Sequence, residues 1–266
     1  FYSKLTIVRH GVLGVRLNKQ NHCVPDGPEP GPNMVILDPA GVYYIQNGPI
    51  GASGAAADIY KWLGIAKDAT FPEAVTTAIT EPLQAKYHVY DTKDVIHAVG
   101  PDLRTHDRTR HEALTELILV YKRALTEFST TMDRLDMQKS LRLLPLSGGI
   151  FAGGFRNQLA ELTMEALEEA FMSLSPAYQQ YFLNAPSFEM CIFADSELRY
   201  YRTAFAQRKK MHEVQLAEAG LGAAKERRTD GEDAAAPDEA PKEEDKAETE
   251  SRRPPLEKAS SSSEEG

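Results

Sequence analysis

A glycine-rich stretch in the middle of the sequence has the residue types that bind a phosphate. It follows the apolar run Leu141–Leu146 and precedes a helical pattern that begins near Asn157. Glycine lets the backbone approach an anion closely, and the start of a helix offers unpaired N–H groups and the positive end of its dipole. We interpret the stretch as a candidate phosphate loop, and the alternative is a plain turn whose serine caps the next helix. Its residues are Ser147, Gly148, Gly149, Ile150, Phe151 and Ala152.

Other titratable residues give weaker indications. Asp38 ends an apolar run and could serve as a base, but Asp-Pro after a strand is common turn chemistry, and we favour the turn. His10 and His22 have no acidic or histidine partner at ligand spacing, and residues 106–111 fit the start of a helix. The sequence therefore predicts no metal site, and it contains neither a Gly-x-Ser-x-Gly elbow nor a Walker-type loop.

Composition limits the classes of function. The net charge is -9, and Lys225–Gly266 alone holds 14 acidic and 8 basic residues, so the rest is nearly balanced and no broad basic surface for duplex nucleic acid is expected. The two cysteines, Cys23 and Cys191, exclude a disulfide scaffold and fit a reducing, intracellular compartment. No run approaches the roughly 20 apolar residues of a membrane span. The start at Phe1 would suit a processed mitochondrial protein, and the cytoplasm is the other expectation.

Strand and helix patterns alternate along the chain, which predicts an α/β domain with a mixed, mostly parallel sheet covered on both faces. This domain is expected over residues 1–220, with a proline-rich surface insertion at 21–33. Residues 43–45 fit a short strand or a loop, and Trp62 fits the core. The acidic low-complexity tail 221–266 is expected to be disordered on its own. Strands are expected at 4–8 (extended by 13–17), 34–37, 87–90, 95–99, 141–146 and 188–193, and helices at 53–63, 111–128, 157–174 and 197–220.

Four segments within residues 4–205 resemble the macro domain family, a three-layer α/β/α fold that binds ADP-ribose. They follow one another along the chain in the same order as in the family. Residues 95–101 (VIHAVGP) are close to a strand end of the family, and residues 147–153 resemble its second phosphate loop. Residues 52–60 resemble its first phosphate loop with the following helix, and residues 190–195 resemble a late strand. The resemblance implies further phosphate-binding positions at Ala52, Ser53, Gly54 and Ala55.

The sequence departs from the family pattern at the positions that decide function. Gly11 and Val12 stand where the family has the aspartate that binds the adenine amino group. Gly41 stands where hydrolytic members have the catalytic asparagine, and a glycine has no side chain to orient a ribose or a water. The first loop has Ala52 and Ser53 in place of glycines, and each added Cβ restricts phosphate approach. The family's strand histidine, here His97, is implied to be structural.

Three hypotheses follow, none of which requires a cofactor. The first is a non-catalytic macro-domain-like subunit of a larger assembly with other proteins, with a mitochondrial ribonucleoprotein or ribosome, and hence RNA, as the example. The second is a reader that binds ADP-ribose or a related nucleotide through the two loops. The third is an ADP-ribosyl hydrolase, which the absence of the asparagine at Gly41 disfavours.

Overall fold

The computed structural model describes residues 1–104 and 108–229. The chain divides into two compact units, Phe1–Ala217 and Glu218–Gly266. The features discussed below lie in the first unit. Residues 230–266, which make up most of the predicted acidic tail, and His106 and Asp107 of the predicted helix start lie outside the described residues. The predicted boundary near residue 220 therefore stays a prediction.

A six-stranded sheet forms the centre of the first unit. Neighbouring strands are parallel, except that the edge strand β5 is antiparallel to β6. This confirms the mixed, mostly parallel sheet. In their order across the sheet, the strands are β1 (Leu5–Val8), β8 (Phe188–Cys191), β7 (Ser140–Leu143), β4 (Met34–Pro39), β6 (Lys93–Ala98) and β5 (Ala85–Tyr90).

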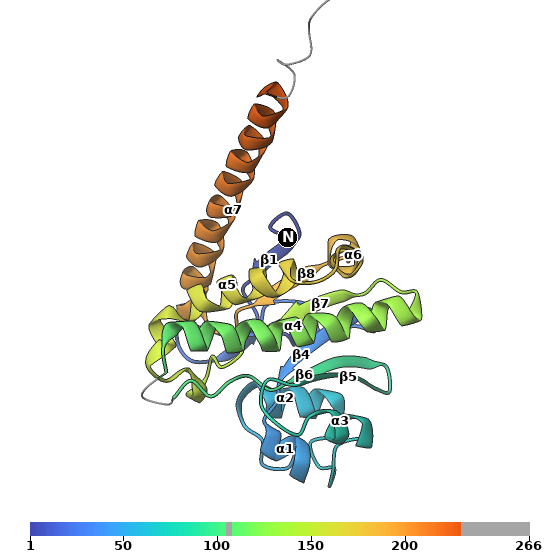
Figure 1. The fold of residues 1–266 in the computed structure, drawn as a ribbon. Helices are drawn as coiled ribbons and strands as arrows, with labels where there is room; N and C mark the ends of the chain where they lie inside the picture. Colours follow the sequence, from blue (N-terminus) through green and yellow to red (C-terminus); the bar gives the residue numbers. More distant parts are fainter. Residues whose placement is uncertain (105–107, 230–266) are drawn as a thin grey trace, which may run out of the picture. The chain divides into compact units, whose positions relative to one another are not determined.

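Helices cover both faces of this sheet. Successive side chains of a strand point to opposite faces, and residues 35–38 of β4 are all buried, so both faces of the central strand are covered. α4 packs against α5, α6, β5 and β6, while α2 packs against β4 and α3 against β5; Figure 1 shows α1, α2 and α3 as a separate group from α4 and α5. The helices are α1 (Val42–Asn47), α2 (Gly54–Leu63), α3 (Glu73–Ala78), α4 (Arg110–Leu135), the 3-10 helix η1 (Ile150–Gln158), α5 (Leu159–Met172), α6 (Pro176–Asn184) and α7 (Asp195–Thr229).

The structure differs from the sequence prediction mainly in short elements. Residues 43–45 belong to helix α1 and not to a strand, and α3 and α6 were not predicted, because six to nine residues give too little periodicity. The helix predicted from residue 157 is preceded by η1. The insertion 21–33 contributes β3 (Cys23–Pro25), which pairs with β2 (Val15–Leu17) in a small separate sheet. The last helix continues past residue 220 to Thr229.

One buried tyrosine of α4 fixes the segment that leaves β7. The Tyr121 hydroxyl donates to the Leu144 carbonyl at 3.1 Å and accepts from the Leu146 N–H at 2.9 Å. Tyr121 has no exposed surface, and burial raises the pKa of its hydroxyl. The backbone that leads into the glycine-rich stretch is therefore held on the helix layer, immediately before Ser147.

Candidate functional site

The carboxyl ends of β4, β6 and β7 lie at one edge of the sheet, because these three strands are neighbours and parallel. Ligands of open α/β sheets bind outside this edge. A backbone hydrogen bond of 3.0 Å from Ala40 to Ala98 ties the ends of β4 and β6 together. The first candidate loop follows β4 by way of α1, and the second follows β7, so the topology brings both loops to the same edge.

The first loop folds back toward the start of α1. Tyr44, in the first turn of α1, donates its hydroxyl to the Gly51 carbonyl at 3.1 Å. Ala52 is half-buried and donates its N–H to the Pro49 carbonyl at 3.2 Å. Ser53, Gly54 and Ala55 are exposed. Ser53 precedes α2 without a side-chain capping bond inside the described chain. The first N–H groups of α2 therefore lack an acceptor from the helix or its cap.

Ser147 holds the second loop against the end of β6. Its side chain is buried, and its hydroxyl donates to the Pro101 carbonyl at 2.5 Å. Its φ is 58°, in the left-handed region that a serine seldom adopts. A Cβ added to Gly100 would lie 2.9 Å from this hydroxyl, so the two turns are in close contact. The alternative interpretation expected Ser147 to cap the next helix. The N-cap of η1 is Gly149, so Ser147 does not have this role.

The remainder of the second loop is open to solvent. Gly148 is half-buried, while Gly149, Ile150 and Phe151 are exposed. Phe151 accepts the Leu103 N–H on its carbonyl at 2.9 Å, so residues 101–104 clasp this loop twice. Ala152 is buried and its N–H points to the Gly149 carbonyl at 3.4 Å, which leaves it little capacity to bind a ligand.

A guanidinium group lies beside the second loop. The Arg104 guanidinium carbon is 4.8 Å from the centre of the Phe151 ring, a cation–π contact. Arg104 also donates two hydrogen bonds to Asp102, at 2.8 Å and 2.5 Å, and these lower the pKa of that carboxyl. The loop thus has a positive group at its rim that is partly neutralised within the protein.

Three glycines of the two loops leave room for a ligand. In the part of the chain that the structure describes, no atom outside the immediate neighbours lies within 4 Å of a Cβ placed on Gly51, Gly54 or Gly149. A phosphate can therefore approach the backbone at these positions. Of the predicted ligand-binding residues, Ser147 and Ala152 are buried, Ala52 and Gly148 are half-buried, and the others are exposed.

Asp38 is a buried partner of His97 and not a turn residue. Its Oδ2 lies 2.7 Å from His97 Nδ1, and both side chains have no exposed surface. On the other side of the ring, His97 Nε2 lies 3.0 Å from the Tyr90 hydroxyl. Burial, and then the Asp38 carboxylate, raises the pKa of both Tyr90 and Tyr60. His97 is a structural residue, as the resemblance implied, and it lies on the inner strand β6.

Gly41 contributes a backbone position and no functional group. It is the N-cap of α1 with an extended backbone (φ −115°, ψ 136°). A Cβ at this position would meet the Tyr44 ring at 3.4 Å, an ordinary contact distance. A side chain could therefore be accommodated here, so the missing asparagine is a feature of the sequence that local packing does not impose.

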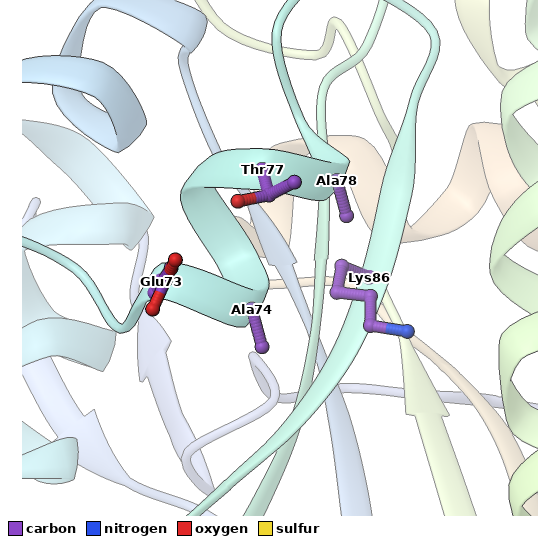
Figure 2. A pocket seen from close by; sticks show the side chains of 5 residues that line it. All are labelled: Glu73, Ala74, Thr77, Ala78 and Lys86. Atoms are coloured by element: carbon purple, nitrogen blue, oxygen red, sulfur yellow. The ribbon is translucent and has the colours of Figure 1, made fainter.

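Two surface hollows in the described residues lie away from these loops. One, of about 520 Å³, opens between α3 and β5 and is lined by Glu73, Ala74, Thr77, Ala78 and Lys86 (Figure 2). Figure 2 shows that the Lys86 and Glu73 side chains are far apart across it, so no set of polar groups converges there. The other is a groove along α7 at residues 210–215. Neither has the converging polar groups of a ligand site.

The described residues form neither a metal-binding cluster nor a membrane-spanning helix. Within residues 1–104 and 108–229, no group of three or more His, Cys, Asp or Glu side chains could hold a metal ion. None of the helices in these ranges has the length and apolar character needed to cross a bilayer.

Sequence comparisons give no relatives, whereas solved structures are similar in fold. Neither a protein-family model nor a curated protein matches the chain. An alphavirus structure described as P23pro-zbd shares 22% identity over 70% of this chain with a TM-score of 0.42, and the match spans only 25% of the alphavirus chain. The Oceanobacillus iheyensis macrodomain with ADP shares 15% identity over 78% of this chain and 92% of its own, with a TM-score of 0.46. A mutant of that macrodomain shares 14% identity over 78% of this chain and 93% of its own, with a TM-score of 0.47.

With TM-scores below 0.5, these matches assign the chain neither a family nor a site residue. The α/β class itself follows from the strand order and from the burial of both faces of the sheet.

Several residues that shape the edge were missed by sequence reasoning. Arg142, Tyr121 and Arg104 act through contacts between distant segments, and so does the pairing of Asp38 with His97, although the sequence had indicated each of these two residues separately. One signal was available: an arginine inside the apolar run Leu141–Leu146 has to find a buried partner.

Proposed function

We propose that this chain is a non-catalytic binding module that holds the phosphate groups of an ADP-ribose-type ligand between its two glycine turns. The observation that carries the proposal is that both turns follow the carboxyl edge of the same parallel strands and are open at Gly51, Gly54 and Gly149. The class of ligand is taken from the motifs at residues 52–60, 95–101 and 147–153, which resemble those of macro domains.

Backbone donors provide the binding chemistry. The first turn of α2 and the start of η1 each present N–H groups without an intrahelical acceptor, and the aligned peptide dipoles of α2 favour an anion at its first turn. In both helices the described first turn has no acidic residue that would repel a phosphate. Arg104 adds a positive side chain at the rim of the second turn.

The same edge supports a non-catalytic role. Gly41 offers no side chain, and the Asp38 carboxylate has no exposed surface because it is turned toward His97. A general base must come within hydrogen-bond reach of the proton that it removes. The hydrolase hypothesis, which Gly41 already disfavoured, is therefore the least supported of the three.

Calorimetric titration of the full chain with ADP-ribose tests this proposal. Ala55→Glu places a carboxylate in the first turn of α2. The helix dipole stabilises a negative charge at this position, but the carboxylate repels a phosphate. We expect this variant to keep or slightly raise the melting temperature and to weaken ADP-ribose binding at least tenfold. Ala55→Gln is the matched control, with the same size and no charge, and should bind like the parent protein.

A second pair of variants tests the other loop. Ile150 is exposed to 69%, so Ile150→Glu and Ile150→Gln should both fold. Only the glutamate should weaken binding. The absence of heat with millimolar ADP-ribose, or equal losses in the glutamate and glutamine variants, would contradict binding at these loops.

A specific surface feature favours a second role, that of a subunit in a larger assembly. Four large apolar side chains are exposed on α1, the first loop and the second loop, namely Tyr43 (70%), Ile50 (63%), Ile150 (69%) and Phe151 (42%). Exposed apolar groups that lie close together often mark protein interfaces. A mitochondrial ribonucleoprotein or ribosome is the assembly to test, by sedimentation of the chain in native extracts. Recovery as a free monomer would count against this role.

A further inference from the structure

We infer that the candidate site takes a compact sugar phosphate or sugar diphosphate and gives no binding contribution to a nucleobase. The reason is that the protein's own segment 9–30 covers the part of the sheet edge over β1 and β8. This inference rests on the proposed function, because it concerns the ligand of the same site.

The segment reaches this position directly from the sheet. It begins at the carboxyl end of β1, which is the outermost parallel strand. Leu17 donates its N–H to the Phe193 carbonyl at 2.8 Å and forms a parallel bridge with Ala194, just beyond the end of β8. The segment therefore lies against the carboxyl ends of both β1 and β8.

A buried arginine of the sheet fastens the segment from below. Arg142, on β7, is only 2% exposed. Its Nη1 donates to the Val12 carbonyl at 3.1 Å and to the Pro28 carbonyl at 2.8 Å, and its Nε donates to Glu189 on β8 at 2.8 Å. Both ends of the covering segment are thus bound to the same guanidinium, whose charge is balanced by an adjacent carboxylate. The cost of separating this buried group from its partners keeps the segment in place.

The two turns inside the segment are packed backbone against backbone. Gly14 has a φ of +80°, and a Cβ there would lie 2.6 Å from the carbonyl oxygens of both Gly27 and Pro28. Gly14 O in turn accepts the N–H groups of Asp26 and Gly27, each at 2.9 Å. Only glycine fits this contact, which leaves no gap between the two turns for a flat ring.

Ion pairs close the outer side of the segment. Asp26 accepts two hydrogen bonds from Arg9, at 2.9 Å and 2.8 Å, and lies 3.1 Å from Arg16. Arg16 also lies 2.5 Å from Asp195 at the start of α7. The hydrogen bonds from Arg9 lower the pKa of Asp26, so this link persists at neutral pH.

The open part of the edge is therefore short. It extends over β7, β4 and β6, and three neighbouring strands span only about 10 Å between the outer two. An opening of this length suits a sugar with one or two phosphates. The adenosine part of a larger ligand would have to project into solvent, where it gains no contacts.

A calorimetric comparison of two ligands with the full chain tests the inference. The ligands are ADP-ribose and ribose 5-diphosphate, which is ADP-ribose without adenosine. We expect their dissociation constants to agree within about threefold, and we expect adenosine alone not to bind. Tenfold tighter binding of ADP-ribose would overturn the inference while leaving the proposed function intact. Binding of neither compound would instead contradict the proposed function.

Two further measurements test where the ligand binds and whether segment 9–30 stays in place when it does. Ala55→Glu should weaken both ligands equally, and unchanged ribose 5-diphosphate binding in this variant would overturn the inference by placing the ligand elsewhere. Hydrogen exchange of the Asp26 and Gly27 amides should be equally slow with and without saturating ADP-ribose. Faster exchange in the complex would show that the segment opens for the base, and would also overturn the inference.

Discussion

The Asp38 carboxylate and the His97 imidazole are joined by a 2.7 Å contact between two central strands, and neither side chain has any exposed surface. Asp38 is opposite His97 in the parallel register of β4 and β6. The pair therefore links the two strands whose carboxyl ends lead to the glycine turns. It uses up the carboxylate that the sequence offered as a possible base.

Removal of one member of this pair should strongly destabilise the protein. His97→Ala leaves a buried carboxylate without its partner, and such changes cost about 3–5 kcal/mol. Asp38→Asn keeps an oxygen that can accept a hydrogen bond and should cost less than Asp38→Ala. Urea unfolding measures these differences. A loss below about 1 kcal/mol in His97→Ala would show that the pair is not important for stability.

Long-range contacts explain which parts of this structure the sequence could predict. The central strands were predictable because each is a short apolar run bounded by turn residues, as at Met34–Pro39. The Asp38–His97 pair spans 59 positions, and the bond from Arg142 to Pro28 spans 114. No local pattern contains such partners, so the cover that segment 9–30 forms over β1 and β8 could not be foreseen.

The short helix α1 was not predicted from the sequence for a different reason. Residues Val42–Asn47 include a β-branched and aromatic sequence that favours strands, yet they form α1. The tertiary position decides, because β4 ends at Pro39 and the chain must turn onto the face of the sheet. The glycine turns themselves were found in the sequence, since glycine content is a local signal. Their openness at Gly51 and Gly149 depends on what packs nearby.

Two adjacent glycines after the second loop should respond oppositely to alanine. Gly153 has a φ of 51°, and a Cβ there would overlap the Leu103 carbonyl oxygen, so Gly153→Ala should cost at least about 2 kcal/mol. Gly154 is exposed within η1, and in the described structure no atom lies within 4 Å of its added Cβ. Gly154→Ala should therefore be neutral or stabilising by up to about 1 kcal/mol. Thermal unfolding of both variants checks the contrast, and equal effects would show that residues 101–104 do not clasp the loop.

The two cysteines should differ sharply in reactivity. Cys23 is exposed, whereas Cys191 is buried in β8 and burial raises the pKa of its thiol. Only the thiolate reacts, so a disulfide reagent should modify one thiol in the native protein and two in urea. Cys23→Ser should remove the fast reaction completely. Rapid modification of both thiols under native conditions would mean that β8 opens readily.

The start of α4 should contribute a stability that depends on pH. Glu112 accepts the Thr109 N–H at 2.8 Å and the Thr109 hydroxyl at 2.9 Å, and Thr109 accepts the Glu112 N–H at 3.2 Å. The backbone bond from Thr109, followed by the hydroxyl bond, lowers the pKa of Glu112. Its folded pKa thus lies below its unfolded value of about 4.3, so the contribution is complete above that pH and is lost as the pH falls through the folded pKa.

Urea unfolding of the parent and of two variants between pH 3 and pH 7 tests this capping interaction. Thr109→Ala should cost about 1 kcal/mol at pH 7, because it removes the cap of α4. Glu112→Gln cannot titrate, so the stability difference from the parent should shrink as the pH falls below about 4. A difference that stays constant across this range would mean that the charge of Glu112 does not stabilise the helix start, and that only the Thr109 hydroxyl does.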